Sequence, residues 1–157
     1  PLVIDADALN LLAARNQPLP PECILTPHPG EAARLLGSTV QDIQNDRFGA
    51  AHSLAEKFKA VVVLKGAGTI VAAPDHRPAV IGAGNPGMAV GGMGDLLTGV
   101  IAALRAQGQP AFDAACVGAL LHAAAGDEAA RDGGERGLLP SDLLPRLRRL
   151  SNPDNVR

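Results

Sequence analysis

Four short segments of the sequence combine glycines with polar side chains, and each follows an apolar run that predicts a strand. They are residues 5–7, 26–30, 65–69 and 82–95. The last of them ends in Gly91-Gly92-Met93-Gly94-Asp95 and leads into an amphipathic helix. Glycine N–H groups beside a helix N-terminus form an anion site. A carboxylate next to a bound phosphate can take the proton of an attacking hydroxyl. Asp95 is therefore a candidate catalytic base; the alternative is a helix cap in a tight glycine turn.

Two of the other segments contain groups that could bind a phosphate. One follows a buried apolar run and consists of Lys65, Gly66, Ala67, Gly68 and Thr69. Its backbone N–H groups and ammonium group suit a nucleotide phosphate, although glycines and a lysine also form an ordinary turn. His28, held between two prolines, could donate to a phosphate or carbonyl, or could cap the helix that Glu31 begins. Asp5 and Asp7 flank Ala6; both could reach one site, or serve as turn and cap.

Residues 82–87 match the GxGxxG pattern, but they do not predict a dinucleotide site. Pro86 and the following glycines prevent a helix from opening there, and Arg105 stands where an acidic residue would be needed. The sequence also lacks a Gly-Lys pair, which excludes a Walker A loop. The segment is expected to form a flexible lid or a turn.

Composition excludes several classes of function. The formal net charge of −2 provides no basic field for nucleic acid or an anionic membrane. Tyr and Trp are absent and only three Phe occur, so no aromatic platform could stack bases. No apolar run is long enough to span a bilayer. The two cysteines form no CxxC pair, which fits a reducing compartment. We expect a cytoplasmic protein without nucleic-acid or membrane partners.

The elements that must position these segments alternate between strands and helices. Strands are expected at residues 2–4, 23–25 and 60–64, with a hairpin formed by 69–73 and 78–81. Helices are expected at 8–14 with Asp7 as N-cap, 31–36, 41–59, 95–107, 110–131 and 138–150. This order predicts an α/β domain with a mostly parallel sheet flanked by helices. Ligands bind such sheets beyond the carboxyl ends of the strands, where the four segments lie.

Taken together and in order, these segments resemble the ADP/ATP-dependent NAD(P)H-hydrate dehydratases, which have a ribokinase-like fold. The matching runs are DADALN at 5–10, TPHPGE at 26–31, VLKGAGT at 63–69, GNPGMA at 84–89 and GGMGDLLTG at 91–99. The family's domain has further strands before the one at residues 2–4. Residues 1–157 are therefore expected to be the C-terminal part of one larger domain.

The resemblance implies a repair enzyme that dehydrates the S-epimer of NADH or NADPH hydrate. ADP or ATP, with Mg²⁺, would phosphorylate the ring hydroxyl, and elimination of phosphate would restore the reduced cofactor. His28 and Asp95 would contact the substrate, with Asp95 as the base. The nucleotide would contact Lys65, Gly66, Ala67, Gly68, Thr69 and Gly94. Supporting roles are expected for Asp7, Asn10, Glu31 and Asn85, and no metal site made of protein groups alone is expected.

The resemblance also implies a homo-oligomer, tetrameric in the family, and a possible fused epimerase domain. The nearest alternative is a ribokinase-like small-molecule kinase of the hydroxymethylpyrimidine or thiazole type. Such a kinase would share the Gly-Gly-Met-Gly-Asp run, but the full TPHPGE run favours the dehydratase. A nucleotide-binding module without catalysis is a second alternative, and Asp95 argues against it because pure binding gains nothing from a carboxylate near phosphate.

Overall fold

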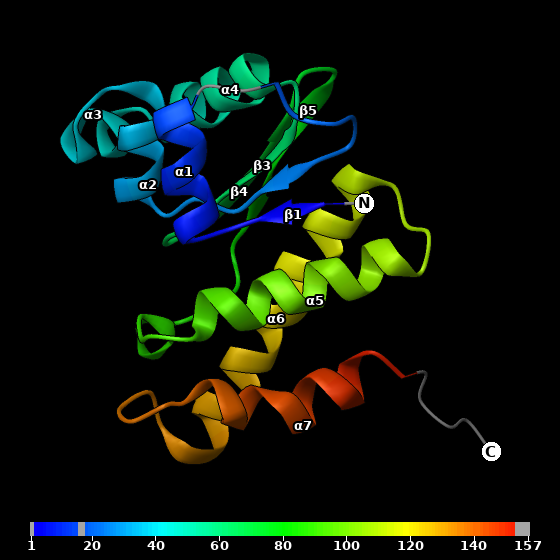
Figure 1. Ribbon diagram of the computed structural model, residues 1–157. Helices are drawn as coiled ribbons and strands as arrows, with labels where there is room; N and C mark the ends of the chain where they lie inside the picture. The colour runs from blue at the N-terminus through cyan, green and yellow to red at the C-terminus, as the bar shows by residue number, and fades with distance from the viewer. Residues whose placement is uncertain (1, 16–17, 153–157) are drawn as a thin grey trace.

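The computed structural model describes residues 2–15 and 18–152, and a five-stranded sheet lies at its centre (Figure 1). The strands are β1 (Val3–Ile4), β2 (Ile24–Leu25), β3 (Val61–Leu64), β4 (Thr69–Ala73) and β5 (His76–Ile81). Their order in the sheet is β1-β2-β3-β4-β5. Neighbours from β1 to β3 pair in parallel, while β3–β4 and β4–β5 pair antiparallel. Parallel pairing therefore occurs where a helical connection separates the strands, as the sequence predicts.

The central strand β3 is buried on both faces, as its unbroken apolar run predicts. Val62 and Leu64 belong to the hydrophobic cluster on one side of the sheet, and Val61 and Val63 to the cluster on the other. Successive side chains of a strand point to opposite faces. Helices must therefore cover the sheet on both sides, which confirms the predicted α/β architecture.

The first four helices cover one face of the sheet (Figure 1). They are α1 (Asp7–Arg15), α2 (Pro29–Leu36), α3 (Val40–Asn45) and α4 (Arg47–Phe58). The prediction of a single helix over residues 41–59 is wrong, because the helix is interrupted at Asp46. The carboxylate of Asp46 accepts a hydrogen bond from the Gly49 backbone N–H at 2.8 Å and begins a new helix. Asp favours such a cap over a helix interior.

The other face is covered by α5 (Met93–Ala106) and α6 (Ala111–Gly133), and α7 (Pro140–Leu150) packs on α6 away from the sheet (Figure 1). The helices α5 and α6 approach closely at Gly118. A Cβ atom there would lie 2.6 Å from Cγ1 of Ile101. The small side chains along α6 therefore allow close packing against α5.

The predicted hairpin is confirmed, although β5 begins at His76 rather than Pro78. Pro78 lies in this edge strand, where a missing backbone N–H is tolerated. Because β3 and β4 are also antiparallel, residues 65–68 form the turn that joins them. This turn carries part of the predicted nucleotide-binding segment.

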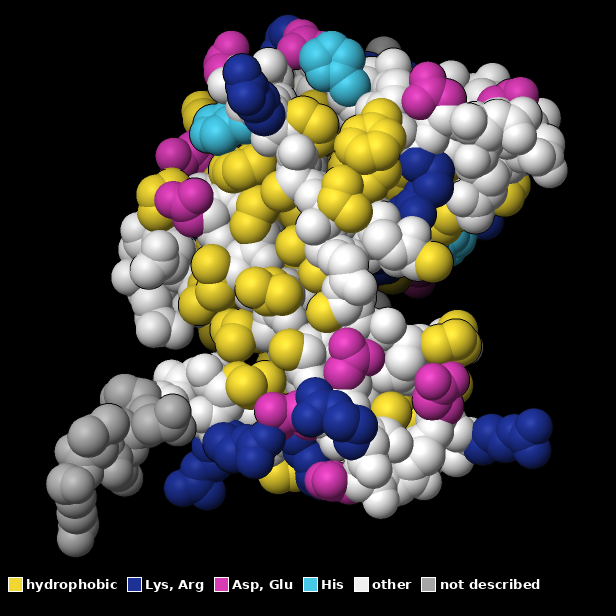
Figure 2. Space-filling model, turned by 180° about the vertical axis from the view of Figure 1, so that it is seen from behind, with side chains coloured by type: hydrophobic (Ala, Val, Ile, Leu, Met, Phe, Trp, Pro, Cys, Tyr) yellow, Lys and Arg dark blue, Asp and Glu magenta, His cyan; other side chains and the backbone are white. Residues whose placement is uncertain are grey.

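The surface of the molecule is mixed rather than uniformly polar. Figure 2 shows hydrophobic side chains gathered over the middle of one face and Lys and Arg side chains at its lower end. Val117 and Leu120 of α6 are about half exposed. In the part of the chain that the structure describes, no helix is long and apolar enough to cross a membrane.

Candidate active site

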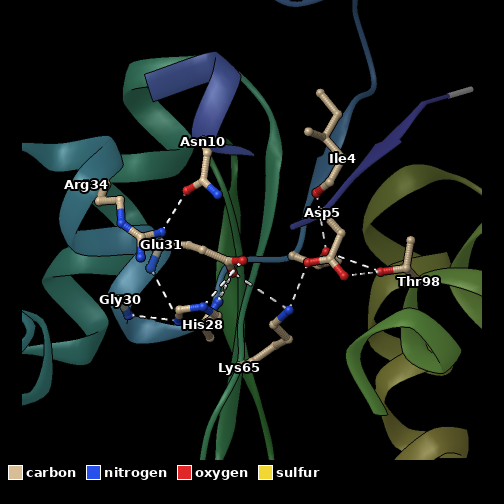
Figure 3. Close-up of polar contacts among 10 residues, drawn as sticks. Ile4, Asp5, Asn10, His28, Gly30, Glu31, Arg34, Lys65 and Thr98 are labelled. Atoms are coloured by element: carbon tan, nitrogen blue, oxygen red, sulfur yellow. Dashed lines mark hydrogen bonds and ion pairs between the residues drawn. The ribbon is translucent and has the colours of Figure 1, made fainter. Parts of the chain in front are cut away.

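Three polar residues follow the three parallel strands directly and lie side by side. Asp5 comes after β1, Thr26 after β2 and Lys65 after β3, and these strands are neighbours in the sheet. Figure 3 shows the side chain of Lys65 between Asp5 on one side and Glu31 on the other. The segments that the sequence places at the carboxyl ends of the strands are thus brought together.

An ion-pair network centred on Lys65 connects these strand ends. Its Nζ donates to Oδ1 of Asp5 at 2.8 Å and lies 3.8 Å from Oε2 of Glu31. The other carboxylate oxygen of Asp5 accepts a hydrogen bond from the Thr98 hydroxyl of α5 at 2.9 Å. The Asp5 side chain is only 8% exposed and that of Lys65 20% exposed. The network therefore binds α5 to the sheet through partly buried charges.

The environment of Asp5 keeps this carboxylate ionised. Burial, the largest influence, raises its pKa, but hydrogen bonds from Lys65 and Thr98 and the charge of Lys65 together outweigh burial and lower the pKa. A carboxylate held in this way is a poor proton acceptor. Asp5 is therefore an anchor for Lys65 rather than a base, and the sequence alone left its role open.

Gly94 lies directly against this network. A Cβ atom at this position would be 3.1 Å from Lys65 Nζ and 3.6 Å from Oδ2 of Asp5. A side chain would press on the buried ion pair, so glycine allows the first turn of α5 to approach it. Two segments predicted to bind the same nucleotide, at Lys65 and Gly94, are thus adjacent.

The turn at residues 65–68 is held from behind by a residue that the sequence did not indicate. The guanidinium of Arg47, the first residue of α4, donates to the carbonyl oxygens of Lys65 and Ala67 in this turn and to that of Leu64 at the end of β3. Gly66 and Gly68 have φ values of 142° and 63°, which only glycine adopts readily. Thr69 closes the turn by donating from its hydroxyl to the Gly66 carbonyl at 3.1 Å. Nothing in the local sequence marks Arg47, because its partners lie in another element.

His28 caps α2, which was one of its two predicted roles. Its Nδ1 accepts hydrogen bonds from the N–H groups of Gly30 at 3.0 Å and Glu31 at 3.3 Å. The carboxylate of Glu31 in turn accepts from the His28 N–H at 2.7 Å, which completes a capping box. With Nδ1 occupied, a proton on this ring lies on Nε2. Nε2 lies 3.4 Å from Oε1 of Glu31, and the imidazole is half exposed, so a ligand could reach this nitrogen only in competition with that carboxylate.

Asp95 lies in the first turn of α5 but does not cap it. The N-cap is Gly92, with φ of 88°, and the helix has no side-chain cap. Asp95 is exposed, and its carboxylate makes no hydrogen bond with the residues that the structure describes. The cap that the sequence left open as an alternative is therefore not observed, and the carboxylate is accessible beside Gly94.

The residues expected to support the site differ in what they do. Asp7 is the first residue of α1 rather than its predicted N-cap; the carbonyls of Asp5 and Ala6 accept the first hydrogen bonds of the helix. Asn10 accepts a hydrogen bond from Arg34 at 2.7 Å and joins α1 to α2. Glu31 contacts Lys65, as described above. Asn85 caps the 3₁₀ turn η1 (Pro86–Met88), so the segment expected to be a lid or a turn is a turn.

Metal binding by this protein depends on the ligands that its side chains offer. Within residues 2–15 and 18–152, no group of three or more His, Cys, Asp or Glu side chains is placed to hold a metal ion. Mg²⁺ commonly needs only one or two carboxylates when phosphate oxygens and water supply the rest. A metal ion that arrives with a nucleotide would therefore take most of its ligands from phosphate oxygens and water.

A mixed α/β sheet with glycine-rich segments at its strand ends places the chain in the ribokinase-like fold class. A family model described as NAD(P)H-hydrate dehydratase matches residues 1–149. The chain belongs to this family.

Individual relatives agree with this membership. The chain is 49% identical to the ADP-dependent (S)-NAD(P)H-hydrate dehydratase of Neisseria meningitidis, over 97% of this chain and 53% of that protein. It is 52% identical to the bifunctional NAD(P)H-hydrate repair enzyme Nnr of Coxiella burnetii, over 98% of this chain and 31% of that protein. The chain thus spans about half or less of the relatives that it matches.

A solved structure confirms the fold class. The ADP/ATP-dependent NAD(P)H-hydrate dehydratase of Bacillus subtilis, co-crystallised with ATP and Mg²⁺, superposes with a TM-score of 0.85 and 34% identity. The match covers 96% of this chain and 55% of that one. The predicted family and ribokinase-like fold are therefore confirmed, while the roles of individual site residues stay predictions.

Proposed function

We propose that this chain carries the nucleotide-binding and catalytic portion of an ADP- or ATP-dependent NAD(P)H-hydrate dehydratase. Its substrate is the S-epimer of hydrated NADH or NADPH. The observation that carries the proposal is the meeting of Lys65 and Gly94, from separate strand ends, beside the unpartnered carboxylate of Asp95. Residues 1–157 would form the C-terminal part of the complete domain, since the relatives are about twice as long or longer.

The nucleotide phosphates would lie against the backbone of residues 65–69 and near Gly94. The Lys65 N–H donates to the Pro27 carbonyl at 2.8 Å and Arg47 occupies carbonyl oxygens of Lys65 and Ala67, so the polar backbone groups that could meet an anion are N–H groups further along the turn. The N-terminus of α5 adds partial positive charge. Mg²⁺ bound to the phosphates would neutralise charge on their oxygens.

The reaction would begin when the ring hydroxyl of the hydrate attacks the terminal phosphorus of the nucleotide. Asp95 accepts the hydroxyl proton as the new O–P bond forms and the bond to the leaving nucleotide breaks. Phosphate then leaves with the electron pair of the C–O bond, the neighbouring ring carbon loses a proton, and the double bond returns. The sum is removal of water from the ring and hydrolysis of one phosphoanhydride bond. His28, with its proton on Nε2, would donate to the substrate.

The remaining expectations concern the whole protein and its surroundings. The Coxiella relative is named as a bifunctional enzyme, which supports a fused second activity in the whole protein; we propose that this activity is an epimerase.

The half-exposed Val117 and Leu120 support a homo-oligomer in which α6 packs against another copy. Cytoplasmic location follows if the substrate is repaired where NADH and ATP are used. Light scattering of the full-length protein measures the assembly.

The decisive experiment incubates the full-length protein with purified NADH hydrate, Mg²⁺ and either ADP or ATP. The expected result is a rise in the absorbance of reduced nicotinamide together with release of phosphate. Omitting the nucleotide should abolish the rise, and Asp95→Asn should slow it by roughly 10²–10⁴-fold. Phosphate transfer to a hydroxymethylpyrimidine or thiazole alcohol without any return of NADH would instead favour the kinase alternative. Absence of NADH recovery with both nucleotides would overturn the proposal.

A further inference from the structure

The segment from Gly84 to Met93 joins β5 to α5 and determines where Gly94 and Asp95 lie. It contains four glycines, at positions 84, 87, 91 and 92. Glycine lowers the barrier to alternative backbone conformations. A segment of this composition needs external contacts to adopt one conformation, and those contacts come from a short stretch of α6, residues 122–127.

The beginning of the segment is held by the carboxylate of Asp127. Its Oδ2 accepts a hydrogen bond from the Gly84 N–H at 2.9 Å, and its Oδ1 accepts from Nδ2 of Asn85 at 3.0 Å. Asn85 extends this hydrogen-bond chain to Gly87, because its Oδ1 accepts a hydrogen bond from the Gly87 N–H at 3.1 Å. Both oxygens of Asp127 are thus occupied by donors, an arrangement that one amide side chain cannot reproduce.

The middle and the end of the segment contact the same stretch of α6. A Cβ atom at Gly126 would lie 2.3 Å from Sδ of Met88, so the glycine lets the Met88 side chain of η1 pack directly against α6 in this rotamer. One turn earlier, the buried His122 lies close to the backbone of Met93, the residue before Gly94, and Met93 packs in one hydrophobic cluster with Ala125 of α6. Start, middle and end of the segment are therefore all fixed to fewer than two turns of one helix.

We propose that Asp127 is a positioning residue for the reaction. By binding Gly84 and Asn85 it fixes the segment that places Gly94 against Lys65 and presents Asp95. Its consequence for turnover rests on the proposed function, whereas its hold on the segment does not. We call the hydrogen bonds from Gly84 and Asn85 to Asp127 the clamp. A displacement of about 1 Å in a reacting group can lower the rate about 10²-fold. Loss of the clamp should therefore reduce kcat while leaving the sheet intact.

Reciprocal exchange of the two side chains tests this proposal. In Asp127→Asn, one of the two donors faces an amide NH₂ and loses its acceptor. In Asn85→Asp, two carboxylates face each other. In the double variant every bond is restored: the new carboxylate at 85 accepts from Gly87 and from the new amide at 127, whose carbonyl accepts from Gly84. Such rescue is measured by a double-mutant cycle.

The first readout is hydrogen exchange, which needs no substrate. The full-length protein with either single substitution should exchange the amides of residues 84–93 faster, while β1, β2 and β3 keep wild-type protection. The double variant should return to wild-type exchange. Asp132→Asn is the matched control, because Asp132 lies on the same helix but is 68% exposed and, among residues 2–15 and 18–152, pairs only with Arg146. This substitution should leave exchange unchanged.

The second readout is turnover of NADH hydrate. Each single substitution should lower kcat about 10- to 100-fold, and the double variant should recover most of it. Wild-type exchange in both single variants would overturn the clamp. Faster local exchange with unchanged kcat would overturn the positioning role, and so would faster exchange across the whole sheet, which would assign Asp127 to general stability. If the wild-type protein does not repair the hydrate, the proposed function is wrong. The hydrogen-exchange data then still test whether Asp127 holds the segment from Gly84 to Met93.

Discussion

Replacing Lys65 by Met would expose how much the fold depends on the ion-pair network. Lys65→Met keeps the apolar stem of the side chain but removes the ammonium group between Asp5 and Glu31. Leaving one member of a buried ion pair alone costs about 3–5 kcal/mol. Lys65 is 20% exposed, and Asp5 keeps its hydrogen bond from Thr98. The expected loss in the free energy of unfolding is therefore smaller, about 2–3 kcal/mol at neutral pH.

The same substitution should reverse the direction in which the ionisation of Asp5 makes the free energy of unfolding depend on pH. In the wild-type protein the pKa of Asp5 lies below its ordinary value of 3.8, so its contribution is present above that pH and is lost as the pH falls through the folded-state pKa. Without Lys65 the effect of burial dominates and raises the pKa. The folded state then keeps a proton that the unfolded chain releases, and stability falls as the pH rises above about 4.

Urea unfolding of both proteins between about pH 2 and pH 8 measures these two effects. Lys59→Met is the matched control, since Lys59 is 73% exposed in its pair with Glu56 and should change the unfolding midpoint little. Adding Asp5→Asn to Lys65→Met should restore part of the lost stability. A Lys65→Met protein as stable as wild type, with the same dependence on pH, would refute the account of the network.

Three further predictions concern other sites. Asp95→Asn should lower turnover by roughly 10²–10⁴-fold with unchanged unfolding and nucleotide affinity; near-normal turnover would reject its role as base. Burial lowers the pKa of His122 to about 4, so stability should decline as the pH falls from about 6.5 to 4, and His122→Leu should lack this decline in urea titrations. Gly118→Ala should cost about 1–3 kcal/mol, because its Cβ would meet Ile101. The open Gly99 provides the control, since Gly99→Ala should stabilise α5 by up to about 1 kcal/mol; equal effects would contradict this packing argument.

The sequence was most informative where chemistry and chain order coincide. The apolar run of β3 and the motifs that follow the strands predicted which segments meet, and Lys65 does lie beside Gly94. The rule that ligands bind at the carboxyl ends of parallel strands needs only the order of elements. For that reason the neighbourhood of the site could be predicted without any knowledge of side-chain contacts.

Contacts between distant elements could not be predicted in this way. Arg47 and Asp127 look like ordinary surface residues of helices, and only the folded chain brings them to the turn at 65–68 and to Gly84. The local sequence does indicate the interruption of the helix at Asp46, because Asn45 and Asp46 both favour helix ends over helix interiors. The hydrophobic periodicity of residues 41–59 continues across the break and concealed it.

The long sequence separation of the network has a consequence for how the protein is made. The bond from Thr98 to Asp5 spans 93 residues and the bond from Lys65 to Asp5 spans 60. A chain that emerges from the ribosome N-terminus first cannot close the bond from Thr98 until α5 has been synthesised. Until then, the pair of Asp5 and Lys65 lacks its contact with α5 on an incomplete sheet. Acquisition of nucleotide binding would therefore mark a late step of folding, and the nucleotide would act as a ligand that stabilises only the finished domain.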